Sequence, residues 1–268
     1  MLTILKIGGS CLTYKKEQKP QLRKGFLKNL AKAIKHYKNK ERSNQLVLVH
    51  GGGSITHPLL DKYNIAQKLK EGTIDQEKDL LATSKIHLAM SLLNKRILQS
   101  LLKENIPAWP IQTSAITTSS KRKIDTIFFK STLLALEKGF IPIIHGDLNI
   151  DTCTTNSICS GDLIACLLAK KLKAKRLLFA SDVDGIYSND PRYHKNIVLI
   201  RNFNIKSTKQ HSNSAEKEFD HSGGMIGKLK YIKEFCDQGM EIIIFNGLRK
   251  DNFNTALSRK NIGTKVSW

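Results

Sequence analysis

The sequence predicts an α/β fold in which a mainly parallel central sheet lies between two layers of helices, a three-layer sandwich. Short apolar runs alternate with longer segments of helical period from one end of the chain to the other, which is typical of such sheets. The apolar runs are rich in Ile, Leu and Val and are soon followed by Gly, Asp or Asn, as expected of buried parallel strands. With 268 residues, 40% of them hydrophobic, the chain is long enough to bury one large core.

The individual elements follow from the two periodicities. We expect strands at residues 3–7, 46–50, 140–144, 177–180 and 241–245, with a weaker one at 108–111. Apolar residues at helical spacing, with lysines on the opposite face, predict a helix over residues 21–37 and a longer one over 77–103. A further helix is expected at 163–171. No repeat or low-complexity linker divides the chain, and the softest boundary falls near Ala174.

The composition excludes several classes of protein. No apolar run is long enough for a membrane-spanning helix, and the opening residues MLTILK lack the layout of a signal peptide, so we expect a cytoplasmic protein that does not bind a membrane. The five cysteines are odd in number and have no zinc-binding spacing, so we expect reduced thiols.

The net charge of +21 would attract polyanions or phosphorylated small molecules. Proteins that bind single-stranded nucleic acid interleave basic residues with aromatic ones. In this chain the lysines are spread along the sequence without such interleaving. We therefore do not expect nucleic-acid binding, and a highly charged soluble surface is the simpler explanation.

Three turns that contain glycine follow predicted strands. They are KIGGS at 6–10, HGGGS at 50–54 and HGD at 145–147. Ligands bind outside the carboxyl ends of the strands in open α/β sheets, so the three turns should meet at one crevice. Glycine lets backbone N–H groups approach an anion such as phosphate, although any single turn of this kind would also serve merely to close a loop. None matches the P-loop or dinucleotide-binding patterns, which argues against both of those enzyme classes.

Three segments of the second half extend this pattern. SGD at 160–162 precedes a predicted helix, an acidic turn at 181–191 follows a strand, and GGMIGK at 223–228 opens another helix. A helix N-terminus with adjacent glycines and a lysine can bind an anion. The acidic turn suits a nucleotide's ribose or purine edge, or groups linked to Mg²⁺, although simple loop capping also accounts for it.

In this order, the motifs resemble those of the amino-acid kinase superfamily, and more narrowly those of the isopentenyl phosphate kinases. The likeness runs from Lys6 to Thr264. It implies one domain of the amino-acid kinase fold over residues 1–268, with an acceptor-binding lobe to about residue 173 and a nucleotide-binding lobe from about residue 174. It also implies a homodimeric, ATP- and Mg²⁺-dependent kinase that converts isopentenyl phosphate to isopentenyl diphosphate in isoprenoid biosynthesis.

The resemblance also implies roles for individual residues. The catalytic residues would be Lys6, Lys15, Asp162 and Lys228, with the lysines stabilising the transferring phosphate and Asp162 orienting them. ATP would be bound by Lys6, Gly8, Gly9, Ser10, Gly53, Asp182, Asp184, Gly185, Tyr187, Gly224 and Lys228. The acceptor phosphate would be bound by Gly52, His57, Gly146 and Gly161. No side chain is expected to belong to a dedicated metal site.

His57 is the residue that narrows the choice of acceptor. By resemblance, isopentenyl phosphate kinases place a histidine just after the glycine turn, where it hydrogen-bonds the substrate phosphate. A histidine beside a triple-glycine turn has a physical reason to face an anion. An isopentenyl tail would also need an apolar slot, for which the predicted helix over 77–103 offers Ile86, Met90, Leu93 and Ile97, although a stripe of this kind also packs an ordinary core.

Two residues next to the second glycine turn depart from the family pattern, and Ser222 stands where Thr is usual but keeps the hydroxyl. Ile55 and Thr56 stand where these kinases commonly have Phe and Gly, so the resemblance does not fix the shape of the acceptor pocket. A kinase for fosfomycin, a small polar phosphonate, is therefore one alternative, and other small acids are further ones. A non-catalytic protein of the same fold that senses nucleotides or binds nucleic acid is an alternative of another class, against which the catalytic residues named above argue together.

Overall fold

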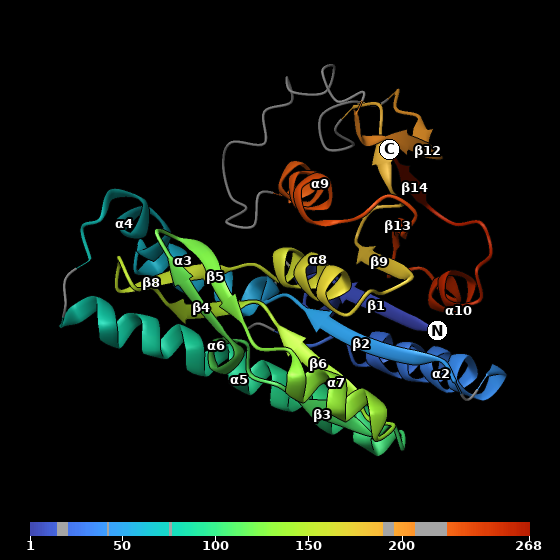
Figure 1. The fold of residues 1–268 in the computed structure, drawn as a ribbon, viewed down its shortest axis with the longest axis horizontal. Coiled ribbons are helices and arrows are strands. Elements are labelled where there is room, and N and C mark those ends of the chain that lie inside the picture. The colour runs from blue at the N-terminus through green and yellow to red at the C-terminus, as the bar shows by residue number, and fades with distance from the viewer. Residues whose placement is uncertain (15–20, 42, 75–76, 190–195, 207–223) are drawn as a thin grey trace.

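One central sheet organises the molecule (Figure 1). A computed structural model describes residues 1–14, 21–41, 43–74, 77–189, 196–206 and 224–268. The sheet has eight strands in the order β12-β14-β13-β9-β1-β2-β6-β3. Their bounds are β1 Leu2–Ile7, β2 Gln45–His50, β3 Ala108–Pro110, β6 Ile141–His145, β9 Arg176–Ser181, β12 Asn202–Asn204, β13 Glu241–Asn246 and β14 Thr264–Ser267. Neighbouring strands are parallel except β13 and β14, which confirms a mainly parallel sheet.

Helices cover both faces of this sheet. One face carries α1 Gly9–Leu12, α2 Lys24–Lys40, α5 Lys78–Lys103 and α10 Asn252–Leu257; the other carries α7 Lys130–Glu137, α8 Gly161–Lys171 and α9 Gly224–Phe235. Successive strand residues point to opposite layers. Leu5 packs in the core that includes α2 and α5, and Ile4 packs in the core that includes α8 and α9. The predicted three-layer α/β sandwich is thereby confirmed. Among the described residues, no helix is both long and apolar enough to cross a membrane.

A smaller unit, which the sequence patterns did not predict, closes one end of the sheet. It contains the helices α3 Gly53–Lys62, α4 Ile65–Glu71 and α6 Thr113–Ile116, with the hairpin strands β4 Thr117–Ser120, β5 Lys123–Ile127, β7 Asp147–Ile150 and β8 Asn156–Cys159. A third apolar cluster joins α3, α4, α5 and β7. The short pair β10 Ile186–Tyr187 and β11 Leu199–Ile200 lies elsewhere, after β9.

The predicted elements agree with the structure except at one helix. All six predicted strands lie within one residue of the observed bounds, and α5 matches the long helix expected over 77–103. The helix expected over 21–37 instead runs from Lys24 to Lys40. Leu22 is paired with Thr13 across an isolated bridge, and the Arg23 N–H donates to the Leu12 carbonyl at 2.8 Å. These backbone contacts delay the start of α2 although Leu22 fits its apolar stripe.

Two of the glycine turns touch each other through their backbones. A β-carbon placed on Gly9 would lie 2.1 Å from the Gly53 nitrogen, and one placed on Gly53 would lie 2.5 Å from the Gly9 carbonyl oxygen. Gly53 also has a positive φ of 54°. Only glycine permits such an approach of two main chains, so the turn after β1 and the start of α3 are fixed against each other.

The contact between Gly9 and Gly53 predicts that an alanine at position 9 destabilises the fold, whereas an alanine in place of an exposed helix glycine should stabilise it. Gly9→Ala should lower the free energy of unfolding by about 2 kcal/mol, because the added methyl overlaps main-chain atoms that cannot yield easily. Gly25→Ala is the matched control, since Gly25 lies in α2 and a β-carbon there meets nothing within 4 Å. That change should raise stability by about 0.5 kcal/mol. Urea unfolding of both variants measures the difference, and equal stabilities would contradict the packing described here.

Candidate active site

A cavity of about 100 Å³ lies at the carboxyl ends of β1, β2 and β6. The three predicted glycine turns contribute to its wall, together with the N-terminus of α8 and residues of α3 and α5. The lining residues are Lys6, Gly9, Gly51, Gly52, Thr56, His57, Leu60, Ile86, Met90, Gly146, Asp147, Leu148, Ile158, Cys159, Ser160, Gly161 and Asp162. The structure therefore brings the three turns to one crevice, as the sequence predicted.

One carboxylate lies between two lysines at this crevice. Lys6 Nζ, from β1, is 2.7 Å from Asp162 Oδ1, and Lys228 Nζ, from α9, is 2.8 Å from Asp162 Oδ2. All three side chains are at least nine-tenths buried. Asp162 is the second residue of α8, whose N-cap Ser160 accepts a hydrogen bond from the Leu163 N–H. Its carboxylate thus also faces the positive end of a helix dipole.

The charges in this triad are strongly coupled. Burial alone would raise the pKa of Asp162, but Lys228 and then Lys6 outweigh burial and bring that pKa down to about 2. Burial lowers the pKa of Lys228, and the Asp162 charge opposes this shift. The Lys228 ammonium also lies 4.6 Å from the centre of the Phe179 ring, a favourable cation–π arrangement. With Asp162 ionised and both lysines protonated, the triad carries one net positive charge.

A pair of buried histidines supports the second and third glycine turns. His50 and His145 end neighbouring strands in register, with ring centres 5.3 Å apart. Each ring places Nδ1 near the carbonyl oxygen of the glycine that follows it, at 3.2 Å for Gly51 and 3.0 Å for Gly146. Burial lowers the pKa of His50 to about 3, so His50 is neutral at neutral pH. This environment gives His50 a structural role at the end of its strand.

The far wall of the cavity is mostly apolar. It contains Leu60 of α3, Ile86 and Met90 of α5, Leu148 of β7 and Ile158 of β8. Ile86 and Met90 thus lie where the sequence hypothesis put them. Leu93 and Ile97 do not line the cavity but belong to the core between α5 and the sheet, because they lie one and two turns farther along the helix.

One polar group interrupts this wall, and sequence reasoning gave it no role. Asp147 is buried, accepts a hydrogen bond from Gln112 Nε2 at 2.6 Å, and lies 3.0 Å from His87 Nδ1. Its place directly after Gly146 was the signal available in the sequence. His87 and Gln112 are distant in sequence, and no local pattern connects them to the site.

Two predicted nucleotide-binding residues, Asp184 and Tyr187, meet in a second cluster around a carboxylate. Asp184 accepts hydrogen bonds from Tyr187 Oη at 3.0 Å, Asn246 Nδ2 at 3.0 Å and Arg249 Nη2 at 2.6 Å. The turn that carries Asp184 lies next to the end of β13, because the Gly247 N–H donates to the Ser181 carbonyl. Asn246 and Arg249 were not identified from the sequence, since they come from a different strand end.

The remaining predicted residues are placed as follows. Gly8 donates its N–H to the Ala180 carbonyl at 2.8 Å, which ties the first turn to β9. Ser10 lies in α1 and Gly224 begins α9. Gly185 has a φ of 157°, and its neighbour Asp182 lies in the same turn. Lys15 lies outside the described residues, and so does the sequence from 207 to 223.

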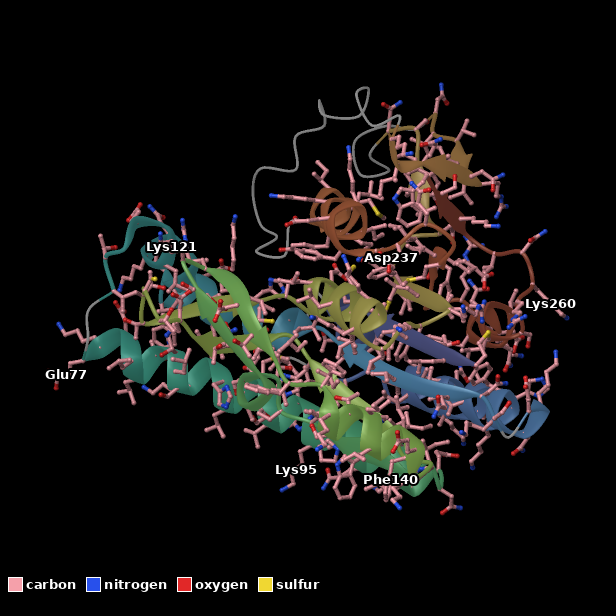
Figure 2. The ribbon with its side chains drawn as sticks, in the orientation of Figure 1. Glu77, Lys95, Lys121, Phe140, Asp237 and Lys260 are labelled. Carbon is pink, nitrogen blue, oxygen red and sulfur yellow. The ribbon has the colours of Figure 1, made fainter. Side chains whose placement is uncertain are left out.

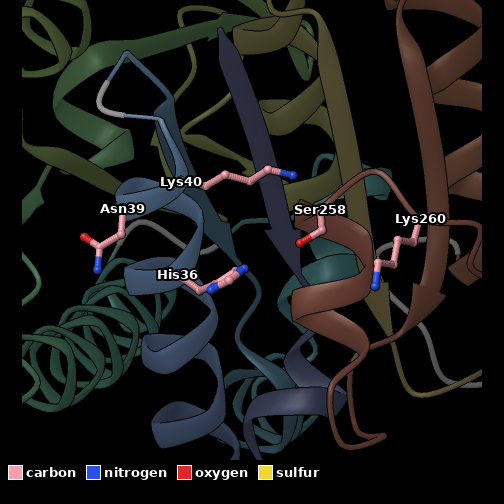
Figure 3. A pocket seen from close by; sticks show the side chains of 5 residues that line it. All are labelled: His36, Asn39, Lys40, Ser258 and Lys260. Carbon is pink, nitrogen blue, oxygen red and sulfur yellow. The ribbon is translucent and has the colours of Figure 1, made fainter.

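A larger hollow lies elsewhere on the surface (Figure 3). It has a volume of about 550 Å³ and is lined by His36, Asn39, Lys40, Ser258 and Lys260, from α2 and the segment after α10. It contains none of the glycine turns, the buried triad or the apolar wall. We therefore assign the candidate active site to the smaller cavity, where the buried charges are.

Metal binding by the protein alone has no support in the described ranges. They hold no group of three or more His, Cys, Asp or Glu side chains that could bind a metal ion. Asp162 is already engaged by two ammonium groups and Asp184 by three donors.

Comparison with known proteins gives consistent matches over the chain. The sequence model of the amino acid kinase family matches residues 1–246. The isopentenyl phosphate kinase of Methanocaldococcus jannaschii is 35% identical and is aligned over 100% of this chain and 99% of its own length. That of Methanothermobacter thermautotrophicus is 28% identical, with 99% of each chain aligned. A crystal structure of isopentenyl phosphate kinase has a TM-score of 0.83 at 26% identity and covers 100% of both chains.

The buried triad predicts a specific dependence of stability on pH. The pKa of Asp162 is depressed from about 3.9 in an unfolded chain to about 2 in the folded protein. Its contribution to stability is therefore fully present above about pH 4 and is lost as the pH falls towards 2. Asp162→Asn should lower the free energy of unfolding by about 3 kcal/mol at pH 7, since it leaves two lysines buried without a counter-charge.

Urea unfolding of the wild type and Asp162→Asn between pH 7 and pH 2 measures this dependence. The difference between the two proteins should be constant at neutral pH and should shrink below about pH 4, because the wild-type carboxylate then becomes protonated as well. A difference that stays constant down to pH 2 would show that Asp162 does not carry the depressed pKa.

Proposed function

Because the chain belongs to the amino acid kinase family, we propose that it transfers the γ-phosphate of ATP to isopentenyl phosphate and releases isopentenyl diphosphate and ADP. One observation carries the choice of acceptor. The lining of one cavity combines Lys6 and the main chain of several glycines with apolar side chains that include Ile86 and Met90. A prenyl monophosphate has the matching shape, a charged head on an apolar tail, and the full-length relatives named isopentenyl phosphate kinase support the assignment.

The transfer step needs position and positive charge more than a nucleophilic side chain. A phosphate oxygen of the acceptor attacks the γ-phosphorus of ATP, a new P–O bond forms, and the bond to the ADP oxygen breaks. Lys6 and Lys228 approach from different elements and would stabilise the charge on the oxygens of the transferring group. Asp162 would keep both ammonium groups in place and protonated, since it bonds each of them. Lys15 remains a predicted third contributor.

The acceptor phosphate would be held by His57 and by the main chain of Gly52, Gly146 and Gly161. All four residues line the cavity beside Lys6, so the phosphate would lie between the cationic triad and α3. The helix dipole of α3 adds a favourable field, because Gly53 is its first residue. The apolar tail would then extend along Leu60, Ile86 and Met90.

The nucleotide would occupy the C-terminal side of the crevice. Its phosphates would meet the turn Gly8, Gly9 and Ser10, together with Gly53 and the start of α9 at Gly224 and Lys228. Its base and ribose would lie near Asp182, Gly185 and Tyr187, where Asp184 orders the turn through its three donors. Mg²⁺ would be held mainly by the ATP phosphates and water, as is usual for kinases, and would neutralise charge on the transferring group. The use of ATP fits the expected cytoplasmic location.

The apolar wall also weighs against the alternatives. Fosfomycin carries an epoxide oxygen beside its phosphonate and amino-acid acceptors carry further charged groups, and such a wall would leave these polar groups without partners. A non-catalytic nucleotide sensor or nucleic-acid-binding protein would have no need for an apolar wall in the same cavity as Lys6.

We also propose a homodimer that is formed through the outer face of α5. Leu81, Leu88 and Leu92 are 49% to 58% exposed, and their spacing puts them on one stripe opposite the buried face of the helix. This helix runs along an outer edge of the molecule, where Glu77 and Lys95 mark it in Figure 2. A second copy would cover the stripe, which supports the dimer that the resemblance implies.

The proposed activity is tested by offering Mg·ATP and one acceptor at a time to the purified protein, with the product mass confirmed. Isopentenyl phosphate should be converted to the diphosphate, dimethylallyl phosphate should react similarly, and fosfomycin should react at least a hundredfold more slowly. His57→Ala should raise KM for isopentenyl phosphate while leaving KM for ATP nearly unchanged. Turnover of fosfomycin alone, or of no acceptor, would refute the proposed substrate.

The proposed interface predicts a change in mass. Leu88→Glu combined with Leu92→Glu should convert a dimer to a monomer, because two like charges per subunit would face each other across the interface. Lys130→Glu is the matched control, since Lys130 is exposed and begins α7 on the opposite face of the sheet, and it should leave the dimer intact. Sedimentation equilibrium measures both. A wild type that sediments as a monomer would refute the proposal.

A further inference from the structure

Thr56 occupies a central place in the acceptor cavity. It lies in the first turns of α3, is only 5% exposed and lines the cavity together with its neighbour His57. It is also one of the two residues that depart from the family pattern, which commonly has glycine here. The side chain therefore adds a hydroxyl and a methyl group to the cavity wall of this protein.

The hydroxyl packs against the glycine turn that is proposed to receive the acceptor phosphate. A β-carbon placed on Gly52 would lie 1.7 Å from Thr56 Oγ1 and 2.9 Å from Met90 Sδ. The Thr56 oxygen and the Met90 sulfur thus occupy the space that a side chain at position 52 would need. Only glycine fits there, and Thr56 and Met90 both line the cavity beside it.

The hydroxyl has hydrogen-bonding capacity to spare. Within the described part of the chain, Thr56 Oγ1 makes no hydrogen bond, whereas Thr13 Oγ1 nearby accepts one from the Ser54 N–H and donates one to the Gly9 carbonyl. A ligand that supplies an acceptor oxygen would give this hydroxyl a hydrogen-bond partner on binding.

We propose that Thr56 is a specificity-determining residue that donates its hydroxyl hydrogen bond to the phosphate of the acceptor. This inference rests on the proposed function, because it assumes a phosphate monoester in this cavity. Position supports it, since Gly52 and His57, which flank Thr56 in the cavity wall, are assigned to the same phosphate. Hydrogen bonds from neutral donors to a charged oxygen are stronger than those between neutral groups, so loss of the hydroxyl should be measurable.

Two substitutions of Thr56 separate the effect of its hydroxyl from that of its methyl group. Thr56→Val keeps the branched shape and removes only the donor, whereas Thr56→Ser keeps the donor and removes the methyl group. Thr56→Val should raise KM for isopentenyl phosphate about tenfold, with KM for ATP changed less than twofold. Thr56→Ser should stay within about threefold of the wild type for both substrates. Thermal unfolding of each variant checks that the fold is retained, and Thr56→Ala repeats the removal of the donor if the valine variant is unstable.

Steady-state kinetics and calorimetric titration with isopentenyl phosphate in the absence of ATP measure these effects. A valine variant that binds the acceptor as tightly as the wild type would overturn the proposal, and so would a serine variant that is impaired as strongly as valine, since shape alone would then matter. Both results need an active wild type, so they leave the proposed function intact. A wild type that neither binds nor converts isopentenyl phosphate would instead refute the proposed function, and the role of Thr56 would fall with it.

Discussion

The ion pairs of Asp162 with two lysines are the interaction on which the rest of the structure depends. The three residues come from β1, α8 and α9, which are far apart in the sequence. A buried carboxylate or ammonium without a partner is strongly unfavourable, so each element needs the other two in their observed positions. The pairing therefore fixes how the C-terminal part of the sheet and its helix meet the N-terminal strands. The same arrangement leaves one positive charge in excess at the edge of the crevice, where phosphate chemistry requires it.

The crevice around this charge is narrow because glycines contact one another there through their backbones. Gly9 touches Gly53, and a β-carbon on Gly146 would lie 2.7 Å from the Gly161 nitrogen. These contacts bring together the ends of three strands and the starts of three helices without side chains between them. The sequence analysis assigned the glycines to phosphate binding, whereas the structure gives them an equally strong reason in packing. Packing and phosphate binding thus require glycine at the same positions, because without side chains the peptide groups are what the main chain presents to a ligand.

How far the sequence predicted the structure depends on the range of the interactions involved. The six strands were predicted because each is a local apolar run, and Lys6, Asp162 and Lys228 were predicted because each lies in a recognisable motif. The hairpins that close the acceptor end have no such signal, since Thr117–Ser120 is entirely polar and two of its side chains are held by hydrogen bonds from the distant Asn149. The partners Arg249 of Asp184 and Gln112 of Asp147 were missed for the same reason. Even α2 was displaced by three residues, because a bridge between Leu22 and Thr13 outweighs its apolar periodicity.

The placement of charge also restricts which ligands the cavity accepts. Lys6 is paired with Asp162 of the triad, whereas the buried Asp147, which follows Gly146 in the cavity wall, is held by Gln112 and His87. The lining thus holds both a cationic group and a carboxylate, so the number and position of charges on a ligand decide whether it fits. A second carboxylate on the tail of an acceptor would meet Asp147 with the same sign of charge. An acceptor with a single phosphate and an uncharged apolar tail satisfies both walls, which is a stronger restriction than the size of the cavity alone imposes.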